Sequence, residues 1–202
     1  MVTHSLLSSW LYTLKENPYD DATTEDDPME DFLQVLRREP RETTEAMQNG
    51  INFENLVTRI INGRFETTPA DDRWYDAATQ IADIVRGGIL QYRAKKEVGV
   101  RGMSVLLYGV LDVLKAGTIY DIKFTKNYDR GKFFGGTQHP MYFELVPEAT
   151  EFTYLASNGT AVFQETYRRE ETPSILRDVS DFFSWLEEAH LMDLYREKWI
   201  AL

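Results

Sequence analysis

Two apolar runs with alternating polar positions lie in the middle of the chain, on either side of a short break that contains a glycine. The first runs from Val105 to Leu114 and the second from Ile119 to Thr125, and both are rich in Val, Ile, Leu, Tyr and Phe. Such composition is typical of strands. The break reads Lys-Ala-Gly-Thr, which favours a tight turn. This stretch therefore predicts a β-hairpin closed by a loop of two or four residues.

The rest of the chain shows helical spacing interrupted by further strand patterns. Apolar residues that recur every three or four positions indicate helices, and a period of two indicates strands. Helices are predicted at 5–16, 30–38, 41–62, 73–85, 138–146 and 174–200, the last broken near His190, and strands at 89–100, 151–156 and 161–168. In the 41–62 helix we expect Met47, Ile51, Leu56, Ile60 and Ile61 to lie in the core. The mixture of elements predicts an α/β fold.

Two aspartates occupy facing positions of the predicted hairpin. Either loop length gives a register in which Asp112 lies opposite Asp121, and Lys123 lies on the same face as Asp121 because side chains alternate along a strand. Like charges directly opposed destabilise a sheet. Both faces of the hairpin are apolar enough to be covered by other elements. We therefore expect two partly buried carboxylates with a lysine beside them.

Buried neighbouring carboxylates require a cation, shared protons or several hydrogen-bond donors. A divalent metal meets this need best, and oxygen ligands at this separation suit Mg²⁺, with Mn²⁺ as a substitute. A lysine two residues further on could orient or help to deprotonate a water molecule, or steady the phosphate that the water attacks. Asp112, Asp121 and Lys123 thus form a candidate hydrolytic site for phosphodiesters.

These residues resemble a nuclease superfamily. Gly-Val-Leu-Asp at Gly109 to Asp112, followed by Asp-Ile-Lys at Asp121 to Lys123, is similar to the motif of the PD-(D/E)XK nucleases, particularly the RecB-like, Cas4-like and phage exonuclease branch. The proline that usually precedes the first aspartate is absent. The resemblance implies an α/β restriction-endonuclease-like core, in which helices flank a central mixed β-sheet. It also implies that the carbonyl of Ile122 completes the metal shell.

Two helical elements extend the resemblance on either side of the hairpin. Gly50 and Glu54 match a G-x-x-x-[EH] element whose acidic or histidine side chain reaches the metal, although Glu54 could equally be a solvated helix glutamate. Gln138 and Tyr142 match a Q-x-x-x-Y element that lines the site near the substrate. Pro140 lies between them, and a proline is compatible with the first turn of a helix. We therefore assign Glu54 as a candidate ligand and Gln138 and Tyr142 as candidate substrate contacts.

A basic and aromatic segment follows the second strand of the hairpin. Lys126, Arg130 and Lys132 alternate there with Tyr128, Phe133 and Phe134. Basic groups interleaved with aromatic rings can grip a phosphate backbone and stack on bases. The alternative is an ordinary loop whose aromatic residues pack on the core. His139 lies just beyond it, where a local hydrogen bond explains a histidine better than metal ligation does; no metalloprotease, serine hydrolase or Walker motif is present.

Composition limits the remaining possibilities. The chain has 202 residues, a net charge of −11 and no cysteine, which excludes disulfides, a thiol nucleophile and a cysteine-ligated cluster. The acidic balance opposes non-specific binding of nucleic acid, so a local basic strip would be needed. Residues 18–31 carry seven acidic residues and no basic one. This composition is typical of a solvated linker and helix start, and the alternative is phosphate mimicry or autoinhibition. No leader or membrane-spanning run is evident, so we expect a cytoplasmic protein without membrane association.

The sequence predicts a helical and acidic extension at 1–45, a nuclease core at 46–172 and C-terminal helices packed on the core at 173–202. The first functional hypothesis is a Mg²⁺- or Mn²⁺-dependent deoxyribonuclease. By resemblance it would be a phage or prophage exonuclease of recombination or repair that can form a homo-oligomer and acts on DNA together with a single-strand annealing protein. The alternative is a catalytically silent module with the same fold that binds protein or nucleic acid.

Overall fold

A computed structural model describes residues 1–14, 27–64 and 73–200 of the chain. The helices are α1 (His4–Thr13), α2 (Pro28–Arg37), α3 (Glu45–Ile61), α5 (Tyr75–Val85), α6 (Gln138–Leu145), α7 (Leu176–Glu188) and α8 (Met192–Lys198), with a 3₁₀ turn at Arg169–Glu171. The strands are β1 (Ile89–Val100), β2 (Met103–Lys115), β3 (Thr118–Phe124), β4 (Glu151–Ser157) and β5 (Val162–Arg168). The predicted order of elements is confirmed.

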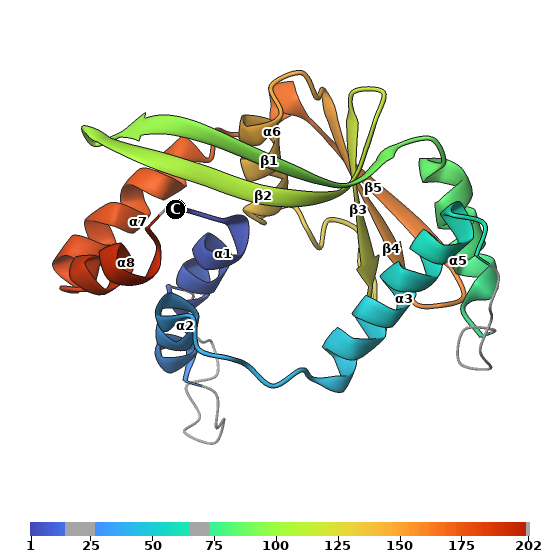
Figure 1. Ribbon diagram of the computed structural model, residues 1–202, viewed down its shortest axis with the longest axis horizontal. Helices are drawn as coiled ribbons and strands as arrows, with labels where there is room; N and C mark the ends of the chain where they lie inside the picture. Colours follow the sequence, from blue (N-terminus) through green and yellow to red (C-terminus); the bar gives the residue numbers. More distant parts are fainter. Residues whose placement is uncertain (15–26, 65–72, 201–202) are drawn as a thin grey trace.

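The strands form one mixed sheet in the order β1-β2-β3-β4-β5 (Figure 1). Neighbouring strands are antiparallel except β3 and β4, which are parallel and are joined through α6. A parallel connection needs such a crossover. β4 lies between β3 and β5, and six of its seven residues are buried. The predicted α/β class, with a central mixed sheet flanked by helices, is confirmed.

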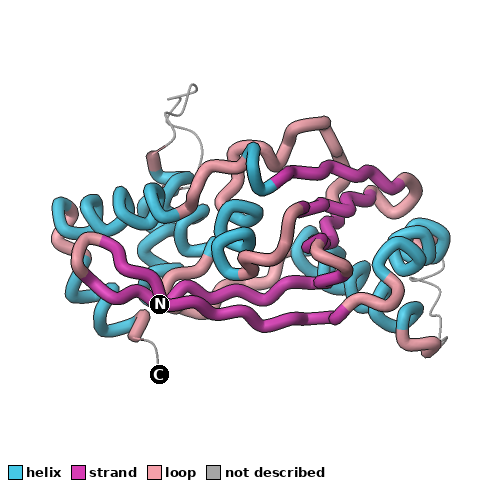
Figure 2. The backbone as a smooth tube through the Cα atoms, turned by 90° about the horizontal axis from the view of Figure 1, so that it is seen from above, coloured by secondary structure: helices cyan, strands magenta, loops and turns pink. Residues whose placement is uncertain are grey.

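The helices cover the sheet in two groups, each with its own apolar core. One core joins α1, α2, α6, α7 and α8 to buried residues of the sheet such as Leu107, Leu111 and Phe152. The second core joins α3 and α5 to Val113 and Leu155. Figures 1 and 2 show α1, α2, α7 and α8 at one end of the molecule, α3 and α5 at the other, and α6 between them. The region where β2 and β3 meet therefore lies between two separately packed lobes.

Polar residues fix the starts of three helices. The side chain of Thr3 accepts a hydrogen bond from the backbone N–H of Leu6, Asp27 accepts from the first turn of α2, and Thr44 accepts from Met47. Each satisfies an N–H group that the helix itself leaves unpaired. Because Thr44 provides this cap, α3 starts four residues later than the predicted boundary at Arg41.

The central hairpin has the predicted register. Val113 pairs with Tyr120, and the two-residue turn places Ala116 and Gly117 at φ values of 49° and 82°. Both values are positive, as a type I′ turn requires, and its twist matches that of the strands. The β2–β3 pairing extends from Lys115–Thr118 to Val113–Tyr120. Beyond that pair the strands diverge, immediately before the two aspartates.

One prediction about the core is wrong. Met47 and Ile51 are 53 % and 48 % exposed, whereas Leu56 and Ile60 are buried as expected. The apolar partners of α3 are the residues of its second core from Phe53 onward, so the N-terminal half of the helix has an apolar flank with no such cover.

The other predicted helices and strands differ from the structure only at their ends, and some predictions concern residues outside the described ranges. Residue 190 has a positive φ of 55° and separates α7 from α8, which confirms the predicted break near His190. Most of the acidic stretch 18–31 lies outside the described residues. In the described parts of the chain, no helix combines the length and apolarity needed to cross a membrane.

Two glycines give a matched test of packing. A Cβ at position 109 would lie 2.4 Å from Cε1 of Tyr142 and 3.0 Å from Cδ1 of Leu145, whereas a Cβ at position 50 would have no neighbour within 4 Å. We expect Gly109→Ala to lower the free energy of unfolding by about 1–3 kcal/mol. Gly50→Ala should raise it by up to about 1 kcal/mol, since alanine favours a helix. Urea unfolding measures both, and equal effects would contradict this account.

Candidate active site

The two aspartates lie where the sheet splits. Past Val113–Tyr120, β3 no longer pairs with β2, and the side chain of Asp112 takes over the contact: its Oδ2 accepts a hydrogen bond of 2.8 Å from the backbone N–H of Ile122. On the other side of β2, the β1–β2 pairing has Leu90–Val113 and then Tyr92–Leu111, and the pair Gln91–Asp112 between them is missing. Asp112 thus sits at an interruption of both ladders, and its carboxylate binds a backbone group that regular pairing would otherwise occupy.

Asp121 is the more deeply buried of the pair, with 3 % of its surface exposed. Its Oδ1 accepts a short hydrogen bond from Nε2 of Gln138, and its Oδ2 lies 2.8 Å from Nζ of Lys123. The contact of Oδ2 with the ammonium of Lys123 is thus an ion pair at hydrogen-bond distance. The side chain of Lys123 is 34 % exposed, so the lysine reaches from this carboxylate toward the solvent.

A third carboxylate comes from α3. Glu54 is half-buried, and its Oε1 accepts a hydrogen bond of 2.8 Å from Nε2 of Gln91. Burial raises the pKa of Glu54, and the negative charge of Asp121 raises it further. Glu54 is therefore not a fully solvated helix glutamate, and its role as a metal ligand stays a prediction.

Three acidic side chains, those of Asp112, Asp121 and Glu54, interact electrostatically with the single ammonium group of Lys123. Burial raises the pKa of Asp112 well above its usual value, and the charges of Asp121 and Glu54 raise it further. Burial also raises the pKa of Asp121, against the opposing effects of Lys123 and Gln138. For Lys123, burial lowers the pKa, but Asp121 outweighs it, so that the net pKa is raised and the side chain is an ammonium at neutral pH. Additional positive charge would stabilise this arrangement.

The chemistry of the donors fits a hard divalent cation. Carboxylate oxygens of Asp112, Asp121 and Glu54 are ligands of the kind that Mg²⁺ and Mn²⁺ prefer, and Oδ2 of Asp121 is a buried oxygen whose partner is the ammonium of Lys123. The N–H of Ile122 points toward β2, and in a strand the carbonyl of the same residue points to the same edge. Across the described residues, no three cysteine, acidic or histidine side chains are already arranged as a metal cluster.

Gln138 and Tyr142 lie at the site but hold protein groups. Gln138 at the start of α6 donates to Asp121, and the hydroxyl of Tyr142 donates a 2.8 Å hydrogen bond to the carbonyl of Val110, two residues before Asp112. The close approach of Gly109 to the Tyr142 ring makes room for this contact. Both side chains therefore position the aspartates, while direct contact with a substrate stays a prediction.

The loop after β3 has features of both interpretations of its sequence: aromatic rings that pack on the core, and basic side chains that are exposed. Tyr128 stacks on Phe163 and Phe133 stacks on Tyr154, with ring centroids 4.6 and 4.3 Å apart, so these rings pack on the sheet. The basic residues are exposed: Lys126, Arg130 and Lys132. Lys126 and Lys132 line a pocket of about 360 Å³ beside the N-terminal part of α3. Arg130 lies on the loop outside that pocket lining.

Glu165 of β5 organises this loop and was missed in the sequence. Its carboxylate accepts hydrogen bonds from the hydroxyls of Tyr128 and Tyr167 and from the backbone N–H groups of Gly131 and Phe133. Burial opposes ionisation, but these hydrogen bonds, the largest from Tyr167, lower the pKa of Glu165 below its usual value. A glutamate about 35 residues from the loop gives no local sequence signal of this role.

His4 is a second residue that the sequence did not indicate. Its ring lies edge-on to Tyr142 with centroids 5.5 Å apart, and its carbonyl accepts a hydrogen bond from Thr137, next to Gln138. Burial, together with the nearby charge of Lys123, lowers the pKa of His4 to about 4, so the ring is neutral. The start of α1 therefore forms part of the wall of the site.

His139, by contrast, has a packing role. Its ring stacks on Tyr167 at 4.2 Å, and its Nδ1 lies 3.3 Å from the hydroxyl of Tyr154. Burial lowers its pKa to about 4. The hydrogen bond of His139 thus joins it to Tyr154 of β4, 15 residues along the chain, and not to a local group at the start of the helix as predicted.

Comparison with known proteins adds little to this geometry. No protein-family model and no curated protein sequence matches the chain. Among solved structures it is similar to the "Crystal structure of SSO0001", with 14 % identity over 68 % of this chain and 88 % of that chain and a TM-score of 0.41. This likeness is too low to support an argument about function.

A divalent metal should stabilise the folded chain through the three carboxylates. At a metal concentration of 100 times Kd, binding to the native state contributes about 2.7 kcal/mol, which corresponds to a rise in Tm of roughly 5 °C or more. Asp112→Asn should abolish this rise. Without metal, the same variant should melt no lower than the parent protein, because it removes one of the mutually repelling charges. Differential scanning calorimetry with Mg²⁺ and Mn²⁺ measures both effects, and an unchanged metal response in Asp112→Asn would contradict the assignment.

Loss of the Glu165 charge should loosen the basic loop. We expect Glu165→Gln to increase the rate of trypsin cleavage after Arg130 and Lys132 by about tenfold, the equivalent of one charged hydrogen bond of about 1.4 kcal/mol. The exposed Glu148→Gln variant serves as the control. Because the pKa of Glu165 is lowered in the folded state, the difference should persist at neutral pH and disappear as the pH falls through that pKa. Equal cleavage of both variants at neutral pH would show that Glu165 does not hold the loop.

Proposed function

We propose that this chain is a metal-dependent nuclease that hydrolyses phosphodiester bonds. The observation that carries the proposal is the ion pair of 2.8 Å between Lys123 and the buried Asp121, at the point where β2 and β3 separate and Asp112 binds the backbone of Ile122. Buried acids with raised pKa values and a charged partner are characteristic of functional sites. The same residues carry the resemblance to the PD-(D/E)XK nucleases.

In this proposal Asp112, Asp121 and the carbonyl of Ile122 hold Mg²⁺ or Mn²⁺, and Glu54 is a further ligand. The metal would polarise the scissile phosphate and lower the pKa of the attacking water. Lys123 is an ammonium, so it acts as a donor: it orients the water through its oxygen and offsets the charge that develops on the phosphate. Gln138 holds Asp121, and Tyr142 holds the backbone beside Asp112.

The proposed substrate is DNA. Lys126 and Lys132 beside the site supply positive charge that the protein, with a net charge of −11, lacks as a whole. The resemblance supports an exonuclease of phage or prophage recombination that works in the cytoplasm with a single-strand annealing protein. A silent module with the same fold would keep the DNA contact and show no cleavage, and the experiment below separates the two.

Removal of the acid or the amine should abolish cleavage without unfolding the protein. We expect Asp121→Ala and Lys123→Ala each to lower kcat/KM for linear DNA by at least about a hundredfold, the loss typical of a charged group that acts in the transition state. Asp181→Ala on α7, an exposed aspartate away from the site, should retain full activity. Release of acid-soluble nucleotides with and without Mn²⁺ measures this. Equal activity of the parent protein and both site variants would contradict the mechanism, and no metal-dependent release by the parent protein would favour the silent module.

A further inference from the structure

Gln91 has a backbone conformation that no turn or helix end requires. Within the described ranges, five residues other than glycine have a positive φ, and four of them lie where this conformation is common. Arg38 is the C-cap of α2, Arg101 and Ala116 lie in hairpin turns, and His190 separates α7 from α8. Gln91, with a φ of 50°, instead lies inside β1. A side chain with a Cβ is strained in this conformation, so the surrounding contacts must hold it.

The strained residue lies opposite the first aspartate of the site. The β1–β2 pairing omits the pair Gln91–Asp112 and continues on both sides of it. β2 also changes core at this level, since Val113 belongs to the core of α3 and α5 and Leu111 belongs to the core of the other helices. The backbone of Gln91 is therefore released from the ladder beside Asp112, and its side chain can bind another element.

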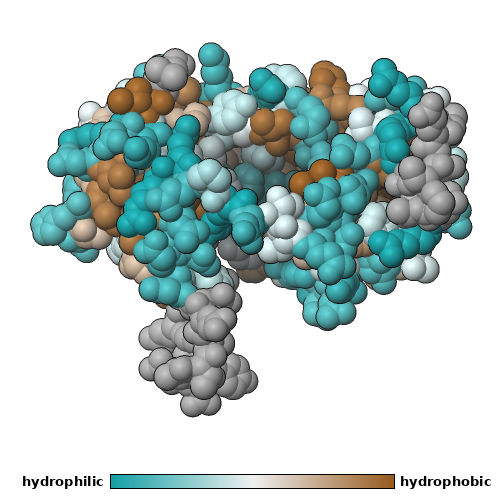
Figure 3. All heavy atoms as spheres, turned by 60° about the horizontal axis from the view of Figure 1, so that its bottom comes forward, coloured by the Kyte–Doolittle hydropathy of each residue, from teal (hydrophilic) through white to brown (hydrophobic). Residues whose placement is uncertain are grey.

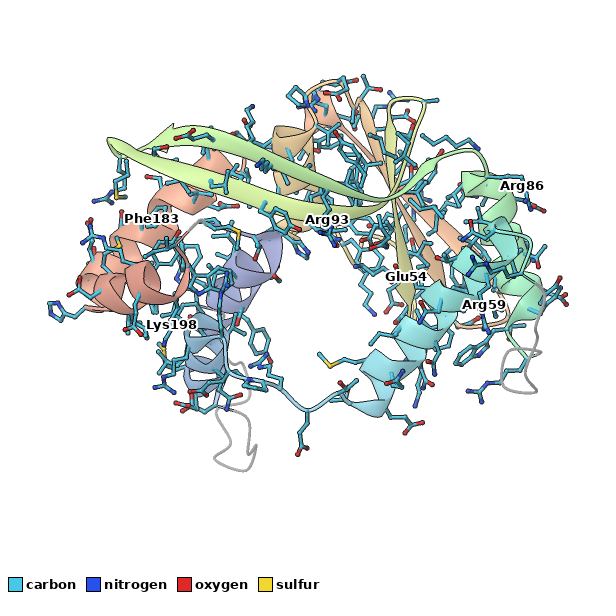
Figure 4. The ribbon with its side chains drawn as sticks, in the orientation of Figure 1. Glu54, Arg59, Arg86, Arg93, Phe183 and Lys198 are labelled. Carbon is cyan, nitrogen blue, oxygen red and sulfur yellow. The ribbon has the colours of Figure 1, made fainter. Side chains whose placement is uncertain are left out.

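That side chain binds the third acid of the site. Nε2 of Gln91 donates a hydrogen bond of 2.8 Å to Oε1 of Glu54 on α3. Figure 4 shows Glu54 on the side of α3 that faces the strands. Burial raises the pKa of Asp112 most, and the charges of Asp121 and Glu54 raise it further, so the three carboxylates are close enough to interact. The hydrogen bond therefore links the strained residue to the candidate metal ligands.

The hydrogen bond lies on the solvent side of the acidic cluster. Gln91 is exposed and Glu54 is half-buried, whereas Asp121 is buried. The space-filling view shows the molecule hollowed between its two groups of helices (Figure 3). A small ion can thus reach the cluster from the solvent, and Glu54 is the more accessible of its acids.

We propose that Gln91 selects the metal ion, because it holds one oxygen of Glu54 and leaves the other oxygen to bind the ion alone. The inference rests on the proposed function, in which Glu54 is a metal ligand. Mg²⁺ demands a compact octahedral shell and binds few carboxylate oxygens, whereas Ca²⁺ takes more oxygens and accepts both oxygens of one carboxylate. Gln91 is therefore a positioning residue that favours Mg²⁺ over Ca²⁺.

Two glycine variants of the full-length protein test this inference. Gln91→Gly keeps the positive φ without strain and removes the amide, and Ala116→Gly makes the same backbone change at a φ of 49° in the β2–β3 turn. Calorimetric titration with Mg²⁺ and with Ca²⁺ measures the Kd of each ion. We expect Gln91→Gly to raise the Kd for Mg²⁺ about tenfold, the lower end of the range for residues that orient metal ligands. The Kd for Ca²⁺ should rise less than about threefold, and Ala116→Gly should match the parent protein.

The ratio of the two Kd values separates metal selection from general support of the fold. An equal rise for both ions, or no rise for either, would overturn the inference and leave the metal site intact. Failure of the parent protein to bind either ion would overturn the metal site of the proposed function and this inference together.

A shorter amide guards against an effect of glycine itself. Gln91→Asn tolerates a positive φ and keeps a polar side chain that is one methylene shorter, so it should change the ratio of Kd values in the same direction. Without metal, both variants at position 91 should melt within about 4 °C of the parent protein. A parental ratio in Gln91→Asn would show that backbone freedom, and not the amide, causes the change in Gln91→Gly.

Discussion

The separation of β2 from β3 at two buried carboxylates is the constraint on which the rest of the structure depends. A backbone N–H at this depth requires an acceptor, and the carboxylate of Asp112 supplies it to Ile122. The second carboxylate, on Asp121, is balanced by the ammonium of Lys123 and by the amide of Gln138. The sheet therefore ends its regular pairing with a cluster of charged groups, and the cost of burying these groups is offset only by specific donors.

The surrounding elements brace this cluster from several sides. α6 brings Gln138 and Tyr142, and the absence of a side chain at Gly109 lets the tyrosine ring lie against β2. Gln91 has a positive φ of 50°, a conformation that is rare for a residue other than glycine, and it binds Glu54. Such local strain is usually kept at functional sites. Together these contacts hold three acids close to one another without a neutralising partner for each.

The proposed nuclease function requires an acidic protein to act on a polyanion. Bulk charge gives no general attraction to nucleic acid, so under this proposal binding would rely on the few exposed cations beside α3. Lys126 and Lys132 line a pocket there. An acidic exterior with such a local basic strip would reduce binding of nucleic acid along the rest of the surface.

The sequence by itself determined the local structure and the chemistry of the strands. The register that opposes Asp112 and Asp121 follows from the turn at Ala116-Gly117, and the period of apolar residues set the limits of β1 and most helices. Tertiary structure decided what surrounds them. His4 and Glu165 reach their places through packing across more than 30 residues of chain, which no local pattern records. Met47 and Ile51 have the periodicity of core residues but lie exposed, because α3 extends beyond the elements that could cover them; periodicity specifies which face of a helix is apolar, while only the fold specifies what that face meets.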